Sequence, residues 1–304
     1  MPIKLPSGLP AKETLEKENV FTISDIRANT QDIRPLKIAV LNLMPDKVAT
    51  ETQLCRVLSN TSLQVELTLL HPCSHQSQHT PEEHIKAFYR SIDDVREEKF
   101  DGLIITGAPV ERLDFSEVTY WDELCRFNEW SKTHVYSTLY ICWAAFAGLY
   151  MNHGVDKLPL DKKLSGVYRH RVLDKTHPLM RGFDDTFFVP HSRWSEPSRE
   201  QIEAAEGIDI LSDSDEAGVY IVGDKDRRRF YITGHSEYDF NTLHKEYVRD
   251  SAKDAKTPIP VNYYPDDDSE KTPPNVWRAH SNLLFSNWLN YCVYQETPYD
   301  LDNM

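Results

Sequence analysis

The sequence predicts a doubly wound α/β fold, in which helices cover both faces of a mostly parallel sheet. Apolar runs rich in β-branched and aromatic residues alternate with amphipathic helical stretches along residues 36–150, a rhythm typical of β–α units. Several runs carry almost no charge, as expected for parallel strands buried on both faces. Residues 36–255 contain no stretch that resembles a flexible linker. We therefore predict one α/β domain over residues 36–304, preceded by an N-terminal arm of residues 1–35.

The composition excludes several classes of protein. A formal net charge of −14 over 304 residues argues against a general nucleic-acid binder, which needs a basic face. The five cysteines are scattered and show neither zinc-ligand spacing nor a disulfide framework, which favours a reducing compartment. No run approaches the ~20 apolar residues of a membrane span, and residues 1–30 lack the apolar core of a signal peptide. We expect a soluble, cytoplasmic protein without bound metal or cofactor, and with no nucleic-acid or membrane partner.

The first third of the chain contains the start signals of three β–α units. Four prolines in the arm favour extended chain there, and Asp46 is a suitable N-cap for the first helix. The period-two alternation of residues 63–69 predicts a half-buried strand near a sheet edge. Thr80 and the three residues after it form a capping box with proline at the first helical position. The predicted elements are strands at 36–43, 63–69 and 101–107, and helices at 46–59, 80–95 and 120–132.

Cys142 lies at the junction of a predicted buried strand, residues 133–141, and a predicted helix that starts at Trp143. A residue on such a turn projects from the carboxyl end of the sheet, where open α/β folds place their sites. The unpaired N–H groups of the helix N-terminus also favour a thiolate over a thiol. The alternative is an inert core cysteine, because cysteine is among the most often buried residues.

In the second half of the chain, the regular alternation of strands and helices gives way to a series of predicted strands. This half contains predicted strands at 164–173, 186–189, 208–211, 219–222 and 229–232, a hairpin turn at 223–226, a helix at 240–250 and a long surface loop at 256–275. The last predicted helix, residues 276–294, is the longest and carries an aromatic stripe that includes Trp277 and Trp288. This stripe indicates either a subunit contact in a possible homodimer or a helix that caps the core.

His235 is the best partner for Cys142 among the twelve histidines, because it follows directly after the strand predicted at 229–232 and the flexible Gly234. In extended chain, residues i and i+2 face the same side, so Glu237 can accept a hydrogen bond from the imidazole and orient it. A thiol nucleophile needs such a base and such an orienting group. The alternative is that residues 234–237 form a solvated turn.

Taken together, the motifs resemble the homoserine O-acyltransferases of methionine biosynthesis, which share a flavodoxin-like, class I glutamine-amidotransferase-like fold. The matching stretches span nearly the whole chain, at 39–45, 50–53, 106–109, 141–143, 190–193, 234–238, 277–280 and 287–290. The resemblance implies that residues 36–304 form a single catalytic α/β domain, with added short strands and a long C-terminal helix.

The resemblance also assigns roles to residues. It implies that Cys142 is the acyl-accepting nucleophile, His235 the general base and Glu237 the third member of the triad. It further implies that three residues contact homoserine or the acyl-enzyme: Lys163, Ser192 and Arg249. The expected mechanism is ping-pong, with L-homoserine and an acyl-CoA as substrates. The backbone N–H of Trp143 is the natural oxyanion donor, and we place the second at Ala108.

Glu111 distinguishes the two donors that the family uses, because succinyl-transferring members typically have glycine there. A glutamate fills the space for the succinyl tail and repels its carboxylate, so we expect acetyl-CoA as donor and O-acetylhomoserine as product. The alternatives are succinyl-CoA as donor and a Glu111 side chain that points to solvent. Basic residues are also needed for the CoA phosphates, and the candidates are Lys162, Lys163, Arg169, Arg171 and Arg227 to Arg229, while Lys47 is a further residue that can reach the site.

Two other functions compete with acyl transfer. A glutamine amidotransferase or related hydrolase shares the fold and the triad, but here Ile141 and Trp143 flank the cysteine in place of glycine, and Ser236 replaces the usual proline between histidine and glutamate. A binding protein on the same scaffold, with a spent site, is the second alternative, and the intact triad argues against it.

Overall fold

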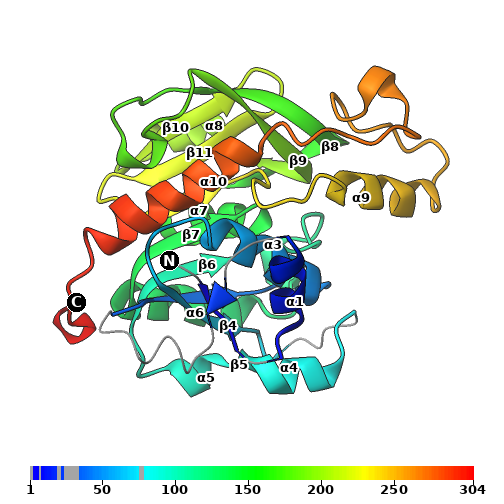
Figure 1. The fold of residues 1–304 in the computed structure, drawn as a ribbon. Helices are drawn as coiled ribbons and strands as arrows, with labels where there is room; N and C mark the ends of the chain where they lie inside the picture. Colours follow the sequence, from blue (N-terminus) through cyan, green and yellow to red (C-terminus); the bar gives the residue numbers. More distant parts are fainter. Residues whose placement is uncertain (1–2, 7, 19–21, 24–33, 75–78) are drawn as a thin grey trace.

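The computed structural model describes residues 3–6, 8–18, 22–23, 34–74 and 79–304. In this part of the chain twelve strands form one sheet, with the order β2-β1-β4-β3-β6-β7-β12-β11-β10-β8-β9 and with β5 paired to β4. Figure 1 shows β8 to β11 at the top of the molecule and β4 to β7 below them. The strands from β2 to β12 along this order are parallel, and β11, β10, β8 and β9 continue the sheet in antiparallel pairing. The predicted α/β class with a doubly wound parallel sheet is confirmed.

The strands are β1 (Ile3–Lys4), β2 (Thr22–Ile23), β3 (Leu36–Leu41), β4 (Val65–Leu70), β5 (Tyr89–Arg90), β6 (Phe100–Ile105), β7 (Val135–Ile141), β8 (Lys157–Val172), β9 (Thr186–Pro197), β10 (Ile208–Ser214), β11 (Gly218–Asp224) and β12 (Arg229–Ile232). The helices are α1 (Pro10–Lys17), α3 (Lys47–Leu58), α4 (Glu82–Phe88), α5 (Ile92–Val95), α6 (Trp121–His134), α7 (Trp143–His153), α8 (Arg199–Ala204), α9 (Thr242–Ser251) and α10 (Arg278–Asn287), which the π-helix η4 (Trp288–Tyr294) continues. Four short 3₁₀ helices are η1 (Phe115–Glu117), η2 (Pro178–Met180), η3 (Pro265–Asp267) and η5 (Leu301–Asn303).

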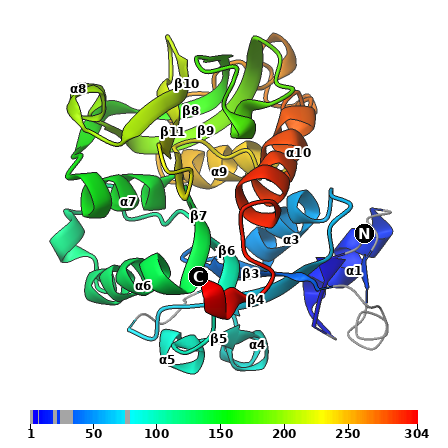
Figure 2. The same ribbon diagram turned by 90° about the vertical axis from the view of Figure 1, so that its left-hand side faces the viewer.

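Helices cover both faces of the parallel strands. Figure 2 shows α3 and α10 on one side of the sheet and α6 and α7 on the other. Two glycines let helices approach closely. A Cβ on Gly102 of β6 would lie 2.8 Å from the indole of Trp288, and a Cβ on Gly148 of α7 would lie 2.7 Å from the ring of Tyr140, distances that real side chains do not tolerate. The glycines therefore seat η4 and α7 directly on the central strands.

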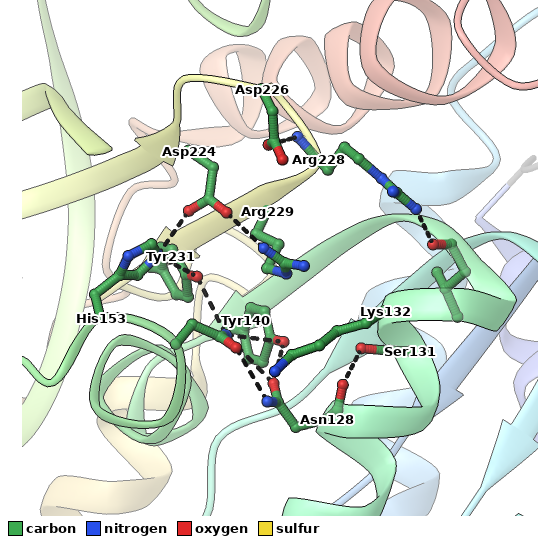
Figure 3. Close-up of polar contacts among 12 residues, drawn as sticks. Asn128, Ser131, Lys132, Tyr140, His153, Asp224, Asp226, Arg228, Arg229 and Tyr231 are labelled. Carbon is green, nitrogen blue, oxygen red and sulfur yellow. Dashed lines mark hydrogen bonds and ion pairs between the residues drawn. The ribbon is translucent and has the colours of Figure 1, made fainter. Parts of the chain in front are cut away.

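A buried polar network fixes α6 and α7 against β7 and β12 (Figure 3). The Tyr140 hydroxyl donates to Asn128 Oδ1 at 2.6 Å, and the Tyr140 ring stacks on Tyr231 with centroids 5.1 Å apart. His153 Nε2, at the end of α7, lies 2.9 Å from Asp224 Oδ1 and 3.1 Å from the Tyr231 hydroxyl. Buried polar groups that are satisfied rigidify a core, so this network fixes the C-terminal end of α7 against β11 and β12.

The N-terminal arm departs from the extended form expected of it. Residues 10–17 form α1, which buries Ala11 and Leu15 and packs on α3, and β1 pairs with β4. Proline at the first helical position suits a helix start, so Pro10 favours the helix that it was expected to oppose. β4 is third from one end of the sheet, and only the two-residue strands β1 and β2 lie beyond it, so the predicted position near an edge is confirmed. Residues 24–33 of the arm lie outside the described part.

The single helix predicted at 80–95 is also wrong. The chain forms α4, then the short strand β5, then α5, whose capping box is made by Ser91 and Asp94. Thr80 does not cap α4, because its hydroxyl donates to Pro45 O and accepts from the Lys47 N–H. A tertiary contact therefore uses the side chain that the local pattern assigned to a cap.

Of the five strands after α7, β8 to β11 are longer than predicted, and β12 has the predicted bounds. β8 and β9 pair from Lys157 opposite Pro197 to Arg171 opposite Thr186, with an irregular stretch between Pro159 and Leu164. The C-terminal helical segment is close to its prediction, and its aromatic residues Trp277 and Trp288 are buried within the chain. The stripe therefore caps the core, and both the homodimer and the single-domain organisation stay predictions.

Candidate active site

The three parallel strands β6, β7 and β12 lie side by side and end at the same edge of the sheet. Each is followed by a residue singled out from the sequence: Glu111 after β6, Cys142 after β7 and His235 after β12. All three line one cavity of about 1120 Å³. The position outside the carboxyl ends of parallel strands is where ligands bind in open α/β sheets.

Cys142 is held in a strained turn between β7 and α7. Its φ is 55° and its ψ is −117°, an uncommon backbone conformation for a residue with a side chain. The Cys142 N–H donates to Ile232 O at 2.7 Å, which fixes the turn to β12. A Cβ on Gly107 would lie 3.1 Å from Cys142 Cβ, so glycine leaves the room that the turn needs. The predicted strand-to-helix junction is confirmed, and its geometry resembles the exposed nucleophile turns of hydrolases.

His235 and Glu237 form a tight pair, with Nδ1 and Oε1 2.7 Å apart. The His235 N–H donates to Pro190 O at 2.9 Å, and the imidazole stacks on Tyr238 with centroids 4.0 Å apart. Because all three groups are largely buried, the solvated-turn alternative is wrong. The imidazole is fixed in tautomer and orientation, since Glu237 holds the Nδ1 proton.

The charges around the pair favour a proton on His235. Burial acts to lower the pKa of His235, but the Cys142 sulfur and the Glu237 carboxylate raise it well above its ordinary value. Burial raises the pKa of the Cys142 thiol, and the His235 side chain is the first influence that opposes this rise. The arrangement is that of a thiol next to a base strong enough to accept its proton.

Glu111 points into the cavity. Its Oε1 lies 3.8 Å from Cys142 Sγ, and its Oε2 accepts a hydrogen bond from the backbone N–H of Trp194. Its own backbone oxygen accepts from Lys157 Nζ at 3.0 Å and from the Ser195 hydroxyl at 3.2 Å. Only 9% of the residue is exposed, and this burial raises the pKa of the carboxyl. The alternative of a carboxylate in solvent is therefore wrong.

Lys163, Ser192 and Arg249 all line the same cavity. The sequence reasoning missed the group that joins the first two, Glu246 on α9. Glu246 Oε2 accepts from the Ser192 hydroxyl and lies 3.3 Å from Lys163 Nζ, and its Oε1 accepts from the Tyr238 hydroxyl at 2.9 Å. The spacing of Glu246 and Arg249, three apart on a helix, places them on one face and could have revealed it.

The remaining predicted residues are the two oxyanion donors, Lys47 and the candidates for binding the CoA phosphates. Trp143 begins α7 directly after Cys142, and Ala108 lines the cavity next to Gly107; their roles as oxyanion donors stay predictions. Lys47 is buried with its ammonium on the Asn42 and Met44 carbonyls, and burial lowers its pKa to about 8. Among the CoA candidates, Lys162 and Lys163 line the cavity, whereas Arg169, Arg171 and Arg227 to Arg229 do not.

The fold defines the class of protein: an α/β protein with a class I glutamine-amidotransferase-like fold. A glutamine amidotransferase from Thermotoga maritima superposes with a TM-score of 0.56 at 11% identity, covering 86% of this chain and 99% of that one. A second, from Methylobacillus flagellatus, gives 0.55 at 12%, covering 88% and 99%. At such identities the likeness concerns the fold alone.

The family follows from the sequence comparisons. A family profile described as homoserine O-succinyltransferase matches residues 2–299. Three relatives named homoserine O-acetyltransferase cover 100% of both chains: those of Acetivibrio thermocellus and Thermotoga neapolitana are 57% identical, and that of Bacteroides thetaiotaomicron is 56% identical. The chain belongs to this homoserine O-acyltransferase family. In the described part of the chain, no helix has the length and apolar character needed to cross a membrane.

Proposed function

We propose that the protein is a homoserine O-acetyltransferase, which transfers the acetyl group of acetyl-CoA to the hydroxyl of L-homoserine and forms O-acetyl-L-homoserine for methionine biosynthesis. The observation that carries the choice of donor is the Glu111 carboxyl 3.8 Å from the Cys142 sulfur. The acyl group of a Cys142 thioester has to occupy the space beside this sulfur. An acetyl group is small enough to do so next to a glutamate, whereas a succinyl tail would meet the carboxyl with its own carboxylate.

Succinyl transfer is the second candidate, because the description of the matching family names it. The relatives at 56–57% identity, however, are named acetyltransferases. The glutamine amidotransferase alternative has only the fold and the Cys-His-Glu arrangement in its favour.

The mechanism follows from the geometry. His235 accepts the proton of Cys142, and the thiolate attacks the thioester carbon of acetyl-CoA. Backbone N–H groups of Trp143 and Ala108 stabilise the oxyanion of the tetrahedral intermediate. CoA leaves with the proton from His235 and an S-acetyl Cys142 remains. His235 then removes the proton of the homoserine hydroxyl as its oxygen attacks the acetyl carbon, and Glu237 keeps the imidazole oriented in both steps.

Homoserine is a zwitterion, so its subsite has to bind both a carboxylate and an ammonium group. The Arg249 guanidinium forms an ion pair with Asp250 at 2.8 Å and can hold the homoserine carboxylate as a bidentate pair. Lys163 stands beside it. Glu246 and the Ser192 hydroxyl offer acceptors for the ammonium group of homoserine. Ammonium and carboxylate then fix the substrate at two ends, so that its hydroxyl reaches the acetyl-enzyme.

The test of this function is the mass of the intact protein after mixing with each donor. Acetyl-CoA should add one acetyl group, which homoserine should remove as O-acetylhomoserine, and succinyl-CoA should give little adduct. A stable succinyl adduct would support the second candidate instead. Release of ammonia from glutamine would support an amidotransferase, and no adduct with any donor would leave only a binding protein. The cytoplasmic location and the homodimer stay predictions.

Loss of His235 and loss of Glu237 should lower the activity to different extents. His235→Ala removes the group that moves both protons and should lower kcat by several powers of ten. Glu237→Ala leaves the imidazole in place but frees its tautomer, so we expect a smaller loss. Steady-state kcat/KM for acetyl-CoA and for homoserine in both variants measures the difference. A larger loss in Glu237→Ala than in His235→Ala would contradict the assigned roles.

A further inference from the structure

Three lysines at the mouth of the active-site cavity have no use in the mechanism. Lys162, Lys253 and Lys256 line the cavity and are exposed. Their ammonium groups contact no carboxylate in the described part of the chain, whereas the neighbouring Lys163 is paired with Glu246 and Asp250. A chain with a formal charge of −14 thus keeps three unpaired cations at the entrance to its site.

Two tethers bring these lysines together from distant parts of the sequence. The ion pair from Lys163 Nζ to Asp250 Oδ2, 2.9 Å long, joins the irregular stretch of β8 to the end of α9. Beyond α9, the Val261 N–H donates to Ser165 O at 2.9 Å, and Val261 O accepts from the Val167 N–H at 2.8 Å. The segment that carries Lys253 and Lys256 is therefore pinned along β8, next to Lys162.

A glycine makes the second tether possible. Gly166 pairs with Val261 in parallel, and a Cβ on Gly166 would lie only 2.4 Å from Val261 O. The Gly166 φ of 153° also lies in the region that side chains rarely adopt. Both facts require glycine here. The close approach keeps residues 256–260 against the mouth instead of leaving them as a loose loop.

We propose that Lys162, Lys253 and Lys256 form a phosphate-binding rim that holds the nucleotide end of the CoA donor while its thioester reaches Cys142. This inference rests on the proposed function and adds the place where the phosphates bind. CoA carries its acyl group at one end and all its phosphates at the other, so a donor whose thioester lies at the cavity floor leaves the phosphates at the mouth. Lysine binds phosphate well as a point charge.

Two aspartates at the same mouth, Asp161 and Asp254, leave the lysines available. Asp254 Oδ1 accepts the backbone N–H of Lys256 at 2.9 Å, and so holds the turn that presents this lysine. The rim also lies beside the homoserine subsite, because Lys162 precedes Lys163. In a ping-pong reaction this is no conflict, since CoA leaves before homoserine enters and the two substrates can use one mouth in turn.

The experiment compares two donors that share the thioester and differ in the nucleotide. Acetyl-CoA and S-acetyl-pantetheine are each assayed with homoserine, in the wild type and in the triple variant Lys162→Gln, Lys253→Gln, Lys256→Gln. We expect the ratio of kcat/KM for acetyl-CoA to that for S-acetyl-pantetheine to fall by about tenfold, since exposed charge contacts each contribute little but add up. The same ratio should also become less sensitive to ionic strength in the triple variant.

The matched control is Lys245→Gln, an exposed lysine of α9 that does not line the cavity, which should leave the ratio unchanged. The rim is refuted if the triple variant keeps the wild-type ratio, if both donors weaken equally, or if Lys245→Gln lowers the ratio as much. A wild type that transfers acetyl from neither donor would instead refute the proposed function, so the two failures are distinguishable.

Discussion

Replacement of Cys142 by alanine is expected to abolish acetyl transfer and the acetyl adduct on the protein. The reason is covalent catalysis. Without the sulfur no acetyl-enzyme thioester can form, and no other nucleophile at this position can accept the acetyl group from acetyl-CoA. Activity should drop to the background of the uncatalysed reaction in a steady-state assay. The side chain is small and lies in a turn that β7 and α7 hold in place, so circular dichroism should show a folded variant.

The other four cysteines provide the matched controls. Cys55 and Cys292 are buried, and burial raises the pKa of both thiols, that of Cys292 to about 12. Cys73 and Cys125 are more exposed but do not line the cavity. Alanine at any of the four should leave kcat/KM within a few-fold of the wild type. Acetyl transfer by Cys142→Ala, or loss of the acetyl adduct in one of the controls with the fold intact, would contradict the covalent role of Cys142.

The sheet edge that carries Cys142 and His235 could be predicted, because the local sequence pattern and the fold agreed there. Buried strands were predicted at 101–107, 133–141 and 229–232, and parallel pairing brings the carboxyl ends of such strands together. The position of Cys142 at a strand-to-helix junction needed only the pattern of apolar residues. The positive φ of that cysteine did not follow from the pattern, because it depends on the bond between the Cys142 N–H and Ile232 O across the sheet.

Features that depend on tertiary contacts were missed. Thr80 carried a good capping signal, yet its hydroxyl donates a hydrogen bond to Pro45 O and accepts one from the Lys47 N–H. Glu246 was missed as a site residue because its partners Lys163 and Ser192 come from β8 and β9, more than fifty residues earlier. Local propensity is a weak prior that such contacts override.

The donor preference should reverse, or at least shift strongly, in Glu111→Gly. Removal of the side chain opens the space next to Cys142 Sγ and removes the carboxylate. Two like charges ~4 Å apart repel by ~1 kcal/mol in water and by about 4 kcal/mol at an effective dielectric of 20. This corresponds to roughly one to three powers of ten in the ratio of kcat/KM for acetyl-CoA to that for succinyl-CoA. Measurement of this ratio in the wild type and in the variant is the test.

Glu111→Gln separates charge from volume, because glutamine keeps the size and still accepts the Trp194 N–H. If charge dominates, Glu111→Gln should recover much of the succinyl-CoA activity of Glu111→Gly; if volume dominates, it should behave like the wild type.

The pH dependence gives a second measure. Burial raises the pKa of Glu111, so its charge is present above that raised pKa and is lost as the pH falls. The wild-type preference for acetyl-CoA should therefore weaken on acidification, while the ratio in Glu111→Gln should stay flat over the pH range in which the succinyl carboxylate remains ionised. Titration of Cys142 and His235 cancels in this ratio, because both donors need them equally. A wild type that prefers succinyl-CoA, or a ratio that is the same in all three proteins, would show that Glu111 does not select the donor.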